Sequence, residues 1–109
     1  MASPKTKDFA PESVETARLA KALGHPARIE ILKTLIQLNA CVCGTLVDAL
    51  PLSQATVSQH LKALKEAGLV QGTISGPSVC YCVDPKGWAR AQELLGNFLT
   101  TPSGGNSCC

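Results

Sequence analysis

The residues of this chain best suited to chemistry are its cysteines, six of them in 109 residues. They come as three close pairs: Cys41 with Cys43, Cys80 with Cys82, and Cys108 with Cys109. Thiolates bind soft and borderline metal ions, and close pairs suit chelation, whereas scattered cysteines more often pack as inert apolar residues. The polar N-terminus MASPKTKDFAPES lacks an apolar signal segment, so we expect a cytoplasmic protein with reduced thiols. The pairs therefore indicate metal ligation or redox chemistry rather than structural disulfides.

The first pair lies in the stretch CVC, just before a sequence typical of a DNA-reading helix. We place Cys41 and Cys43 at the entry of a short helix near residues 44–50, since a helix N-terminus favours the thiolate form. Positions two apart on a regular helix diverge by about 200°, so the two thiols converge only if the chain is irregular at Cys41. The alternative is a pair of small apolar residues packed under the DNA-reading helix.

The second pair lies in a segment with the alternation of a strand. Cys80 and Cys82 then share one face, opposite Tyr81, and we expect them to point outward. Ligation, redox use and simple exposure are all open for this pair.

The third pair, Cys108 and Cys109, ends a linker of glycine and serine composition. A linker of about seven residues has a root-mean-square reach of roughly 15 Å. Adjacent thiols suit a soft trivalent species such as arsenite. This pair could add ligands to Cys41 and Cys43 in the same or another subunit, bind an arsenical alone, or have no role.

Hydrophobic periodicity and chain breakers predict the elements that position these cysteines. Apolar spacing indicates helices over 12–23, 27–38, 44–50, 54–67 and 87–99, the last opened by Pro85, and period two indicates strands over 69–74 and 78–83. Ser53 is a good N-cap and Gly68 a good helix end. The fold class is therefore mainly α (α+β): a winged helix-turn-helix of about five helices with a two-stranded β-hairpin wing, in the order ααααββα.

The chain divides by composition into one domain and two flexible ends. We expect a flexible arm over 1–11, a DNA-binding and dimerisation domain over 12–100, and a cysteine-terminated tail over 101–109. The net charge of +2 permits a nucleic-acid partner without requiring one. No apolar run approaches the length of a membrane span, so we expect no membrane partner.

The predicted helix after Ser53 has an apolar stripe and an opposite face of small, amide and lysine side chains. Such a face suits the major groove, where Gln59 could contact adenine and Lys62 could neutralise a phosphate. A merely solvated face is the alternative. His60, at the edge of the stripe, and His25, before a helix, are interpreted as structural residues rather than ligands. The predicted DNA-binding residues are Ser53, Gln54, Thr56, Ser58, Gln59, Lys62 and Lys65.

The stretch CVCGTLVDALPLSQATVSQHLKALKEAGLV resembles the ArsR/SmtB family of metalloregulatory repressors. LGHPARIEIL and VCYCVDP extend the resemblance over about residues 15–99. The resemblance implies a homodimeric repressor of double-stranded operator DNA, whose first and last helices pair across the dimer and whose inducer weakens DNA binding. CVC matches the thiol motif of the arsenic- and cadmium-sensing branches.

This sequence also departs from the family pattern. Leu46 stands where arsenic sensors continue the motif with a third cysteine, residues 1–40 hold no cysteine, and residues 85–101 hold no histidine. A site of two thiols is therefore incomplete unless another part of the chain contributes. The predicted ligands of trivalent arsenic (arsenite) or antimony are Cys41, Cys43, Cys108 and Cys109.

The predicted function is a DNA-binding transcriptional repressor that trivalent arsenic or antimony releases from its operator. One alternative keeps the fold but changes the signal, to cadmium, lead or zinc, or to persulfide or an oxidant. Another is a thiol-based metal carrier or enzyme on the same scaffold. The sequence has no C-x-x-C motif and no histidine suitably placed as a base, which argues against an enzyme.

Overall fold

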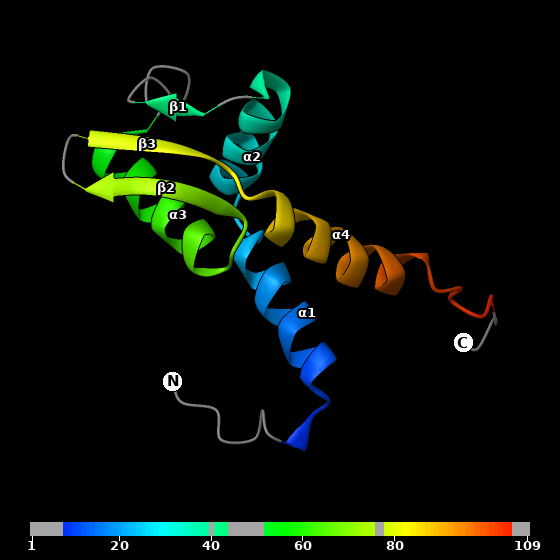
Figure 1. Cartoon of the computed structure of the whole chain (residues 1–109). Coiled ribbons are helices and arrows are strands. Elements are labelled where there is room, and N and C mark those ends of the chain that lie inside the picture. Colours follow the sequence, from blue (N-terminus) through cyan, green and yellow to red (C-terminus); the bar gives the residue numbers. More distant parts are fainter. Residues whose placement is uncertain (1–7, 40, 44–51, 76–77, 106–109) are drawn as a thin grey trace.

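The computed structural model describes residues 8–39, 41–43, 52–75 and 78–105 (Figure 1). The helices are α1, Pro11–Ala22; α2, Pro26–Leu38; α3, Gln54–Glu66; and α4, Pro85–Thr100; the strands are β1, Val42–Cys43; β2, Val70–Ser75; and β3, Ser78–Val83. The β2–β3 hairpin lies against α3, while α1 and α4 contact each other away from the sheet (Figure 1). The predicted mainly α winged helix-turn-helix with a two-stranded hairpin is confirmed.

The predicted number and order of elements is wrong. The residues described form four helices rather than about five, and their order is α, α, β, α, β, β, α. Val42 and Cys43 form strand β1 instead of a helix entry. The reason is that β3 offers an open edge there, and a β-branched residue suits pairing with that edge. The expected short helix at 44–50 lies outside the described residues.

The helix starts follow from residues that satisfy free backbone N–H groups. Proline occupies the first turn of α1, α2 and α4, where its missing N–H costs nothing. His25 accepts a hydrogen bond from the N–H of Ala27 at 3.0 Å through Nδ1, and Ser53 accepts one from Thr56 at 3.2 Å through its hydroxyl oxygen. Asp84 caps α4 in the same way. The predicted roles of His25 at a helix start and of Ser53 as an N-cap are confirmed.

The sheet has the order β1-β3-β2, with antiparallel pairs on both sides of β3. Val42 pairs with Tyr81 and Cys43 with Cys80 on one side, while Gly72 pairs with Tyr81 on the other. Gly72 has φ +135°, and a Cβ there would collide with the backbone of Cys80 and Tyr81. Glycine is therefore required where β2 approaches β3 most closely.

The core lies where α2, α3 and the inner face of the hairpin meet, with α1 and α4 adding their own buried residues. Tyr81 is 2% exposed, and burial raises its pKa to about 12, so its phenol is neutral. The buried apolar cluster comprises Leu19, Ala22, Ile31, Leu32, Leu35, Val57, Leu61, Leu64, Ala67, Leu69, Val70, Tyr81, Ala91 and Leu94. This core fixes which face of α3 and which face of β3 are turned to solvent.

Candidate nucleic-acid interface and thiol site

Helix α3 presents the face that the sequence predicts for DNA contact. Val57, Leu61 and Leu64 are at most 2% exposed, so the predicted apolar stripe is confirmed. The opposite side carries Gln59 and Lys62, both exposed. These two side chains are therefore exposed to solvent on the face opposite the apolar stripe.

The start of α3 and its last turn hold further predicted residues. Thr56 and Ser58 are half-buried, and the Thr56 hydroxyl lies 3.0 Å from that of Ser53. Lys65 donates a hydrogen bond to the carbonyl of Gly72 at 2.6 Å. Lys65 therefore links α3 to strand β2 in this structure. The side chain of Gln54 is not among those that the structure describes.

The two histidines form a cluster with Arg28 at the junction of α2 and α3. Arg28 Nε donates to His60 Nδ1 at 3.1 Å, and the rings of His25 and His60 have centroids 4.4 Å apart. Arg28 also donates to the carbonyl of Ala22 at 3.2 Å. Burial, then His25, then Arg28 lower the pKa of His60 below its usual 6.5. These contacts pack His60 against α2, and its interpretation as a structural residue rather than a ligand stays a prediction.

The thiols of β1 and β3 meet across the ladder. Cys41, which precedes β1, is bonded to Cys82 of β3 as a disulfide, with their Cα atoms 4.3 Å apart. Cys43 and Cys80 are direct partners in the backbone register. The structure thus brings together the first and second cysteine pairs, which the sequence treats separately. Cys108 and Cys109 lie outside the described residues.

The outer face of β3 carries the wing thiols as the alternation predicts. Tyr81 is buried, while Cys80 is exposed and Cys82 half-buried. Gln71 of β2 donates a hydrogen bond from Nε2 to the Cys82 sulfur at 3.8 Å. In the part of the chain that the structure describes, no three His, Cys, Asp or Glu side chains are grouped as metal ligands. The side chain of Cys43 is not among the described ones.

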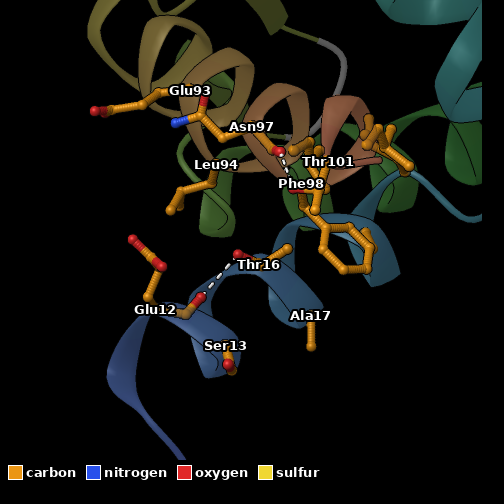
Figure 2. Close-up of a pocket in the computed structure, with 13 residues that line it drawn as sticks. Glu12, Ser13, Thr16, Ala17, Glu93, Leu94, Asn97, Phe98 and Thr101 are labelled. Atoms are coloured by element: carbon orange, nitrogen blue, oxygen red, sulfur yellow. Dashed lines mark hydrogen bonds between the residues drawn. The ribbon is translucent and has the colours of Figure 1, made fainter. Parts of the chain in front are cut away.

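A groove runs between α1 and α4 (Figure 2). Thr16 and Ala17 line it from α1, and Leu94 and Phe98 line it from α4. Phe98 is 66% exposed and its neighbour Leu99 is 74% exposed. This end of the molecule therefore exposes two neighbouring large apolar side chains.

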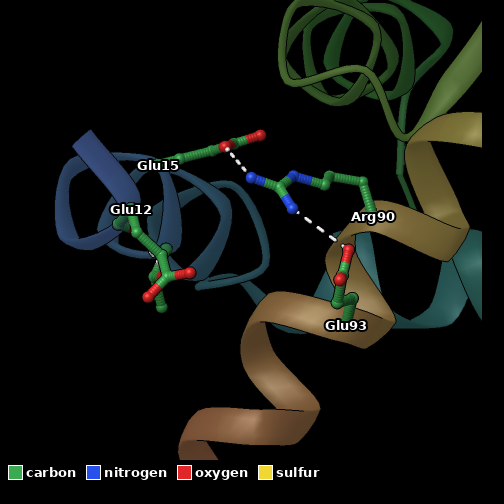
Figure 3. Close-up of polar contacts among 5 residues, drawn as sticks. Glu12, Glu15, Arg90 and Glu93 are labelled. Atoms are coloured by element: carbon green, nitrogen blue, oxygen red, sulfur yellow. Dashed lines mark hydrogen bonds and ion pairs between the residues drawn. The ribbon is translucent and has the colours of Figure 1, made fainter.

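Polar contacts align α1 with α4 at the edge of this groove (Figure 3). Arg90 of α4 donates to Glu15 of α1 at 3.0 Å and to Glu93 of its own helix at 3.0 Å. The carboxylates, Glu15 first, raise the pKa of Arg90. Because these groups are solvent-exposed, the contacts orient the helices more than they stabilise the fold.

Comparison with known sequences identifies the family of this fold. Residues 25–71, from the start of α2 into the hairpin, match the profile described as "Bacterial regulatory protein, arsR family". The chain is 39% identical over 83 residues to an uncharacterized HTH-type transcriptional regulator, MJ1325 of Methanocaldococcus jannaschii, covering 74% of this chain and 88% of that protein. The chain belongs to the ArsR/SmtB family.

A second relative is the HTH-type transcriptional repressor SmtB of Mycobacterium tuberculosis. The two are 51% identical over 63 residues, which is 58% of this chain. The chain spans about half of that relative's length, 46%. The identity is therefore high over the shared segment but says nothing of the remainder of SmtB.

Solved structures of the ArsR/SmtB fold agree with the architecture. One, described as a possible transcriptional regulator for arsenical resistance, has a TM-score of 0.64 at 29% identity, covering 74% of this chain and 83% of that one. Another, the cadmium metal-sensor CmtR from Mycobacterium tuberculosis, has a TM-score of 0.53 at 34% identity, covering 85% and 95%. None of the helices described in the present ArsR/SmtB chain is long and apolar enough to cross a bilayer.

The contact between the first two cysteine pairs was missed from the sequence of this ArsR/SmtB chain. The available signal was that two C-x-C motifs, CVC and CYC, have the same spacing. On strands, each motif places both thiols on one face, so antiparallel pairing of the two brings the thiols into register. Interpreting Cys41 and Cys43 as a helix entry concealed this match.

Proposed function

We propose that this chain is a transcriptional repressor that binds operator DNA through α3 and is released when its cysteines bind trivalent arsenic or antimony. The exposed Gln59 and Lys62 support the DNA-binding part, because they lie opposite the buried stripe of α3. The relatives support repression by a soft-ion sensor: SmtB is named a repressor, CmtR a cadmium metal-sensor, and the solved neighbour a possible regulator for arsenical resistance.

One observation carries the link between thiols and DNA: the contact of Cys41 with Cys82. Cys82 lies on β3, which pairs along its length with β2, and β2 packs against α3. Lys65 of α3 is also hydrogen-bonded to the backbone of β2. An ion held at Cys41 therefore acts on a strand that is mechanically joined to the reading helix. If the ion binds one position of the wing more tightly than another, its binding changes the affinity of the protein for DNA.

The ligand chemistry favours a soft ion. The predicted set, Cys41, Cys43, Cys108 and Cys109, supplies sulfur only, which suits trivalent arsenic and other thiophilic ions better than hard cations. The last two belong to the tail beyond residue 105, outside the description, and their participation stays a prediction.

The proposed assembly is a homodimer formed by α1 and α4. Phe98 and Leu99 are exposed beside the groove that these helices form, and a second copy would cover them. A two-fold dimer would present two α3 helices to successive major grooves of a symmetric operator. Burying this surface also stabilises a chain too short to build a large core of its own.

DNA release by thiol-seeking ions tests the proposal. Duplexes selected by the protein from a random-sequence pool serve as the ligand, and fluorescence anisotropy gives their affinity at several salt concentrations. We expect specific binding that weakens steeply with salt, and release on addition of arsenite to the reduced protein. A chain that binds no duplex, or a complex that arsenite and antimonite leave intact, would show the proposal to be wrong.

A second candidate is a redox-responsive repressor, favoured by the Cys41–Cys82 disulfide. Peroxide would then release the same duplexes while arsenite would not. A cadmium, lead or zinc sensor is distinguished in the same titration, because the divalent ion would act at lower concentration than arsenite.

A further inference from the structure

The wing cysteines are the thiols that the proposed function leaves without a role. We infer that Cys80 and Cys82 complete the site that Cys41 and Cys43 begin, so that thiolates of β1 and β3 hold one thiophilic ion between them. This inference rests on the proposed function, because it names the ligands of the same inducer. The C-terminal pair is then dispensable for binding.

The backbone register brings the two pairs together. Cys43 lies directly opposite Cys80, and the same register, extended past Val42, sets Cys41 opposite Cys82. The Cα atoms of Cys41 and Cys82 are 4.3 Å apart. This separation is typical of a non-hydrogen-bonded pair, in which side chains approach most closely, and such pairs recur at every second position. Cys43 and Cys80 therefore occupy the same kind of close pair.

The site faces solvent and lies outside the core. Tyr81, between the two wing cysteines, is 2% exposed and directed inward, so its neighbours lie on the opposite face of the strand. Cys41 and Cys80 are exposed. Once these two cysteines are reduced, an ion can reach them without any opening of the fold.

The chemistry of the set is that of a soft ion. Arsenous acid would form three arsenic–sulfur bonds and lose three hydroxyl groups, each leaving as water with the proton of one thiol, so no oxidant or reductant is consumed. Four thiolates would instead suit a tetrahedral divalent ion such as Cd²⁺. The hydrogen bond from Gln71 Nε2 to the Cys82 sulfur, at 3.8 Å, favours negative charge on that sulfur in the reduced form.

The disulfide keeps Cys41 and Cys82 from acting as ligands in this structure. Cys41 and Cys82 are bonded to each other, so neither sulfur can ligate until both are reduced. Among the side chains described, no three ligating groups come together. Disulfide formation and ion binding therefore exclude each other at this pair.

The wing thiols also have an entropic advantage over the tail. The β1–β3 ladder already holds Cys80 and Cys82 beside the first pair, whereas the glycine and serine composition before Cys108 and Cys109 predicts a linker that must be ordered before they can ligate. Ordering a flexible segment costs conformational entropy at every residue. The two wing thiols should therefore bind an ion more tightly than the two tail thiols.

Two double variants with matched loss of thiols test the inference. Cys80→Ser/Cys82→Ser removes the wing pair, and Cys108→Ser/Cys109→Ser removes the tail pair. Both full-length proteins are reduced with a phosphine, freed of it without oxygen, and titrated with Cd²⁺ and, separately, arsenite. Ultraviolet charge-transfer absorbance reports the cadmium–thiolate bonds. Alkylation followed by peptide mapping reports which cysteines arsenite protects.

We expect the tail variant to bind like the wild type. The wing variant should lose about half of the absorbance per bound Cd²⁺, and its affinity should fall at least about tenfold, since the loss of an outer-shell partner alone costs about that much at other metal sites. Arsenite should protect Cys80 or Cys82 in the wild type. Loss of binding in both variants would support ligation by the wing pair but contradict the claim that the tail pair is dispensable. Loss only in the tail variant, or an unchanged wing variant, would overturn the inference, as would a wild-type chain that binds neither ion.

Circular dichroism and thermal unfolding of the reduced variants show whether a substitution has disturbed the fold. If the double wing variant is misfolded, the single variant Cys80→Ser, at an exposed position, is titrated with the same ions instead. The ion titrations contain no DNA. A chain that holds an ion across the wing but binds no duplex therefore contradicts the proposed function alone. A chain that releases duplex with arsenite while its wing variant binds ions normally contradicts this inference alone.

Discussion

The two ends of this molecule are built in opposite ways. At the wing end, β1, β3 and β2 form a continuous ladder, a disulfide joins Cys41 to Cys82, and Lys65 ties α3 to the hairpin. At the other end, α1 and α4 enclose an open groove beside exposed Phe98 and Leu99. The wing end is closed within one chain, whereas the helical end leaves large apolar side chains exposed.

This difference leads us to assign ion response and DNA contact to the wing end, and assembly to the helical end. The sheet ladder, the disulfide and the Lys65 hydrogen bond join the cysteines to α3, so under the proposed function a chemical change at the thiols reaches α3 over a short path. Under the same proposal, the α1–α4 surface acts by joining two copies. Substitutions at one end should therefore change ion response or intrinsic DNA contact, and substitutions at the other should change assembly.

The largest expected effect comes from breaking the helical end. In Phe98→Glu, a charge replaces the most exposed aromatic ring of the groove, so we expect the dimer to dissociate. A monomer binds a two-half-site duplex with one helix instead of two, and its affinity should fall by about 100-fold or more. Sedimentation gives the mass and fluorescence anisotropy the affinity.

Gln92→Glu, which adds a charge at an exposed position of the same helix, is the matched control and should stay dimeric. Cd²⁺ binding should be unchanged in both variants. The comparison of the two ends is wrong if Phe98→Glu remains dimeric, or if it loses the ion site along with the dimer.

The next effect concerns the wing end alone. The Cys41–Cys82 disulfide closes a loop with a sequence separation of 41 residues. A crosslink over a loop of this length should raise the free energy of unfolding by about 3 to 4 kcal/mol through the entropy of the unfolded chain. Urea unfolding of oxidised and reduced wild type should show this difference.

Cys41→Ser should remove the part of that gain that the Cys41–Cys82 crosslink provides, while Cys109→Ser, which leaves the ladder intact, should keep the whole gain. The oxidised monomeric Phe98→Glu variant should also keep it, since the crosslink lies within one chain. An equal gain on oxidation in Cys41→Ser would mean that another pair of thiols carries the crosslink.

Sequence reasoning succeeded where local signals decide the structure. Ser53 and Gly68 mark the ends of α3, and the spacing of Val57, Leu61 and Leu64 fixes its buried face, because caps and periodicity act within a few residues. It failed at CVC, since a two-residue strand exists only through its distant partner β3. The thiol contact followed that failure: Cys41 and Cys82 are 41 positions apart, and only register brings them together.

A smaller effect separates specific from general DNA contact on α3. Gln59→Ala should cost about 1 to 3 kcal/mol on duplexes with adenine at the contacted position and much less on others. Lys62→Ala should weaken all duplexes alike and lower the slope of log affinity against log salt by about 1. Anisotropy titrations on matched duplexes at several salt concentrations measure both. Equal losses on all duplexes for Gln59→Ala would show that this side chain does not read bases.

The smallest effect tests the junction that supports α3. Burial, His25 and Arg28, in that order, hold the pKa of His60 below 6.5, whereas the unfolded chain takes up its proton near 6.5. As the pH falls below 6.5, the unfolded state therefore binds the proton first, and the free energy of unfolding declines until the pH has passed the folded-state pKa. A protonated His60 also loses the hydrogen bond that Arg28 donates to its Nδ1. The urea midpoint of the reduced protein should fall as the pH is lowered from above to below 6.5. It should fall less in His60→Gln, whose amide oxygen can still accept a hydrogen bond from Arg28.

Phe98→Glu should show the same change of urea midpoint with pH as the wild type, because its substitution lies at the other end of the molecule. An equal change in His60→Gln and in the wild type would assign the pH dependence to a different group.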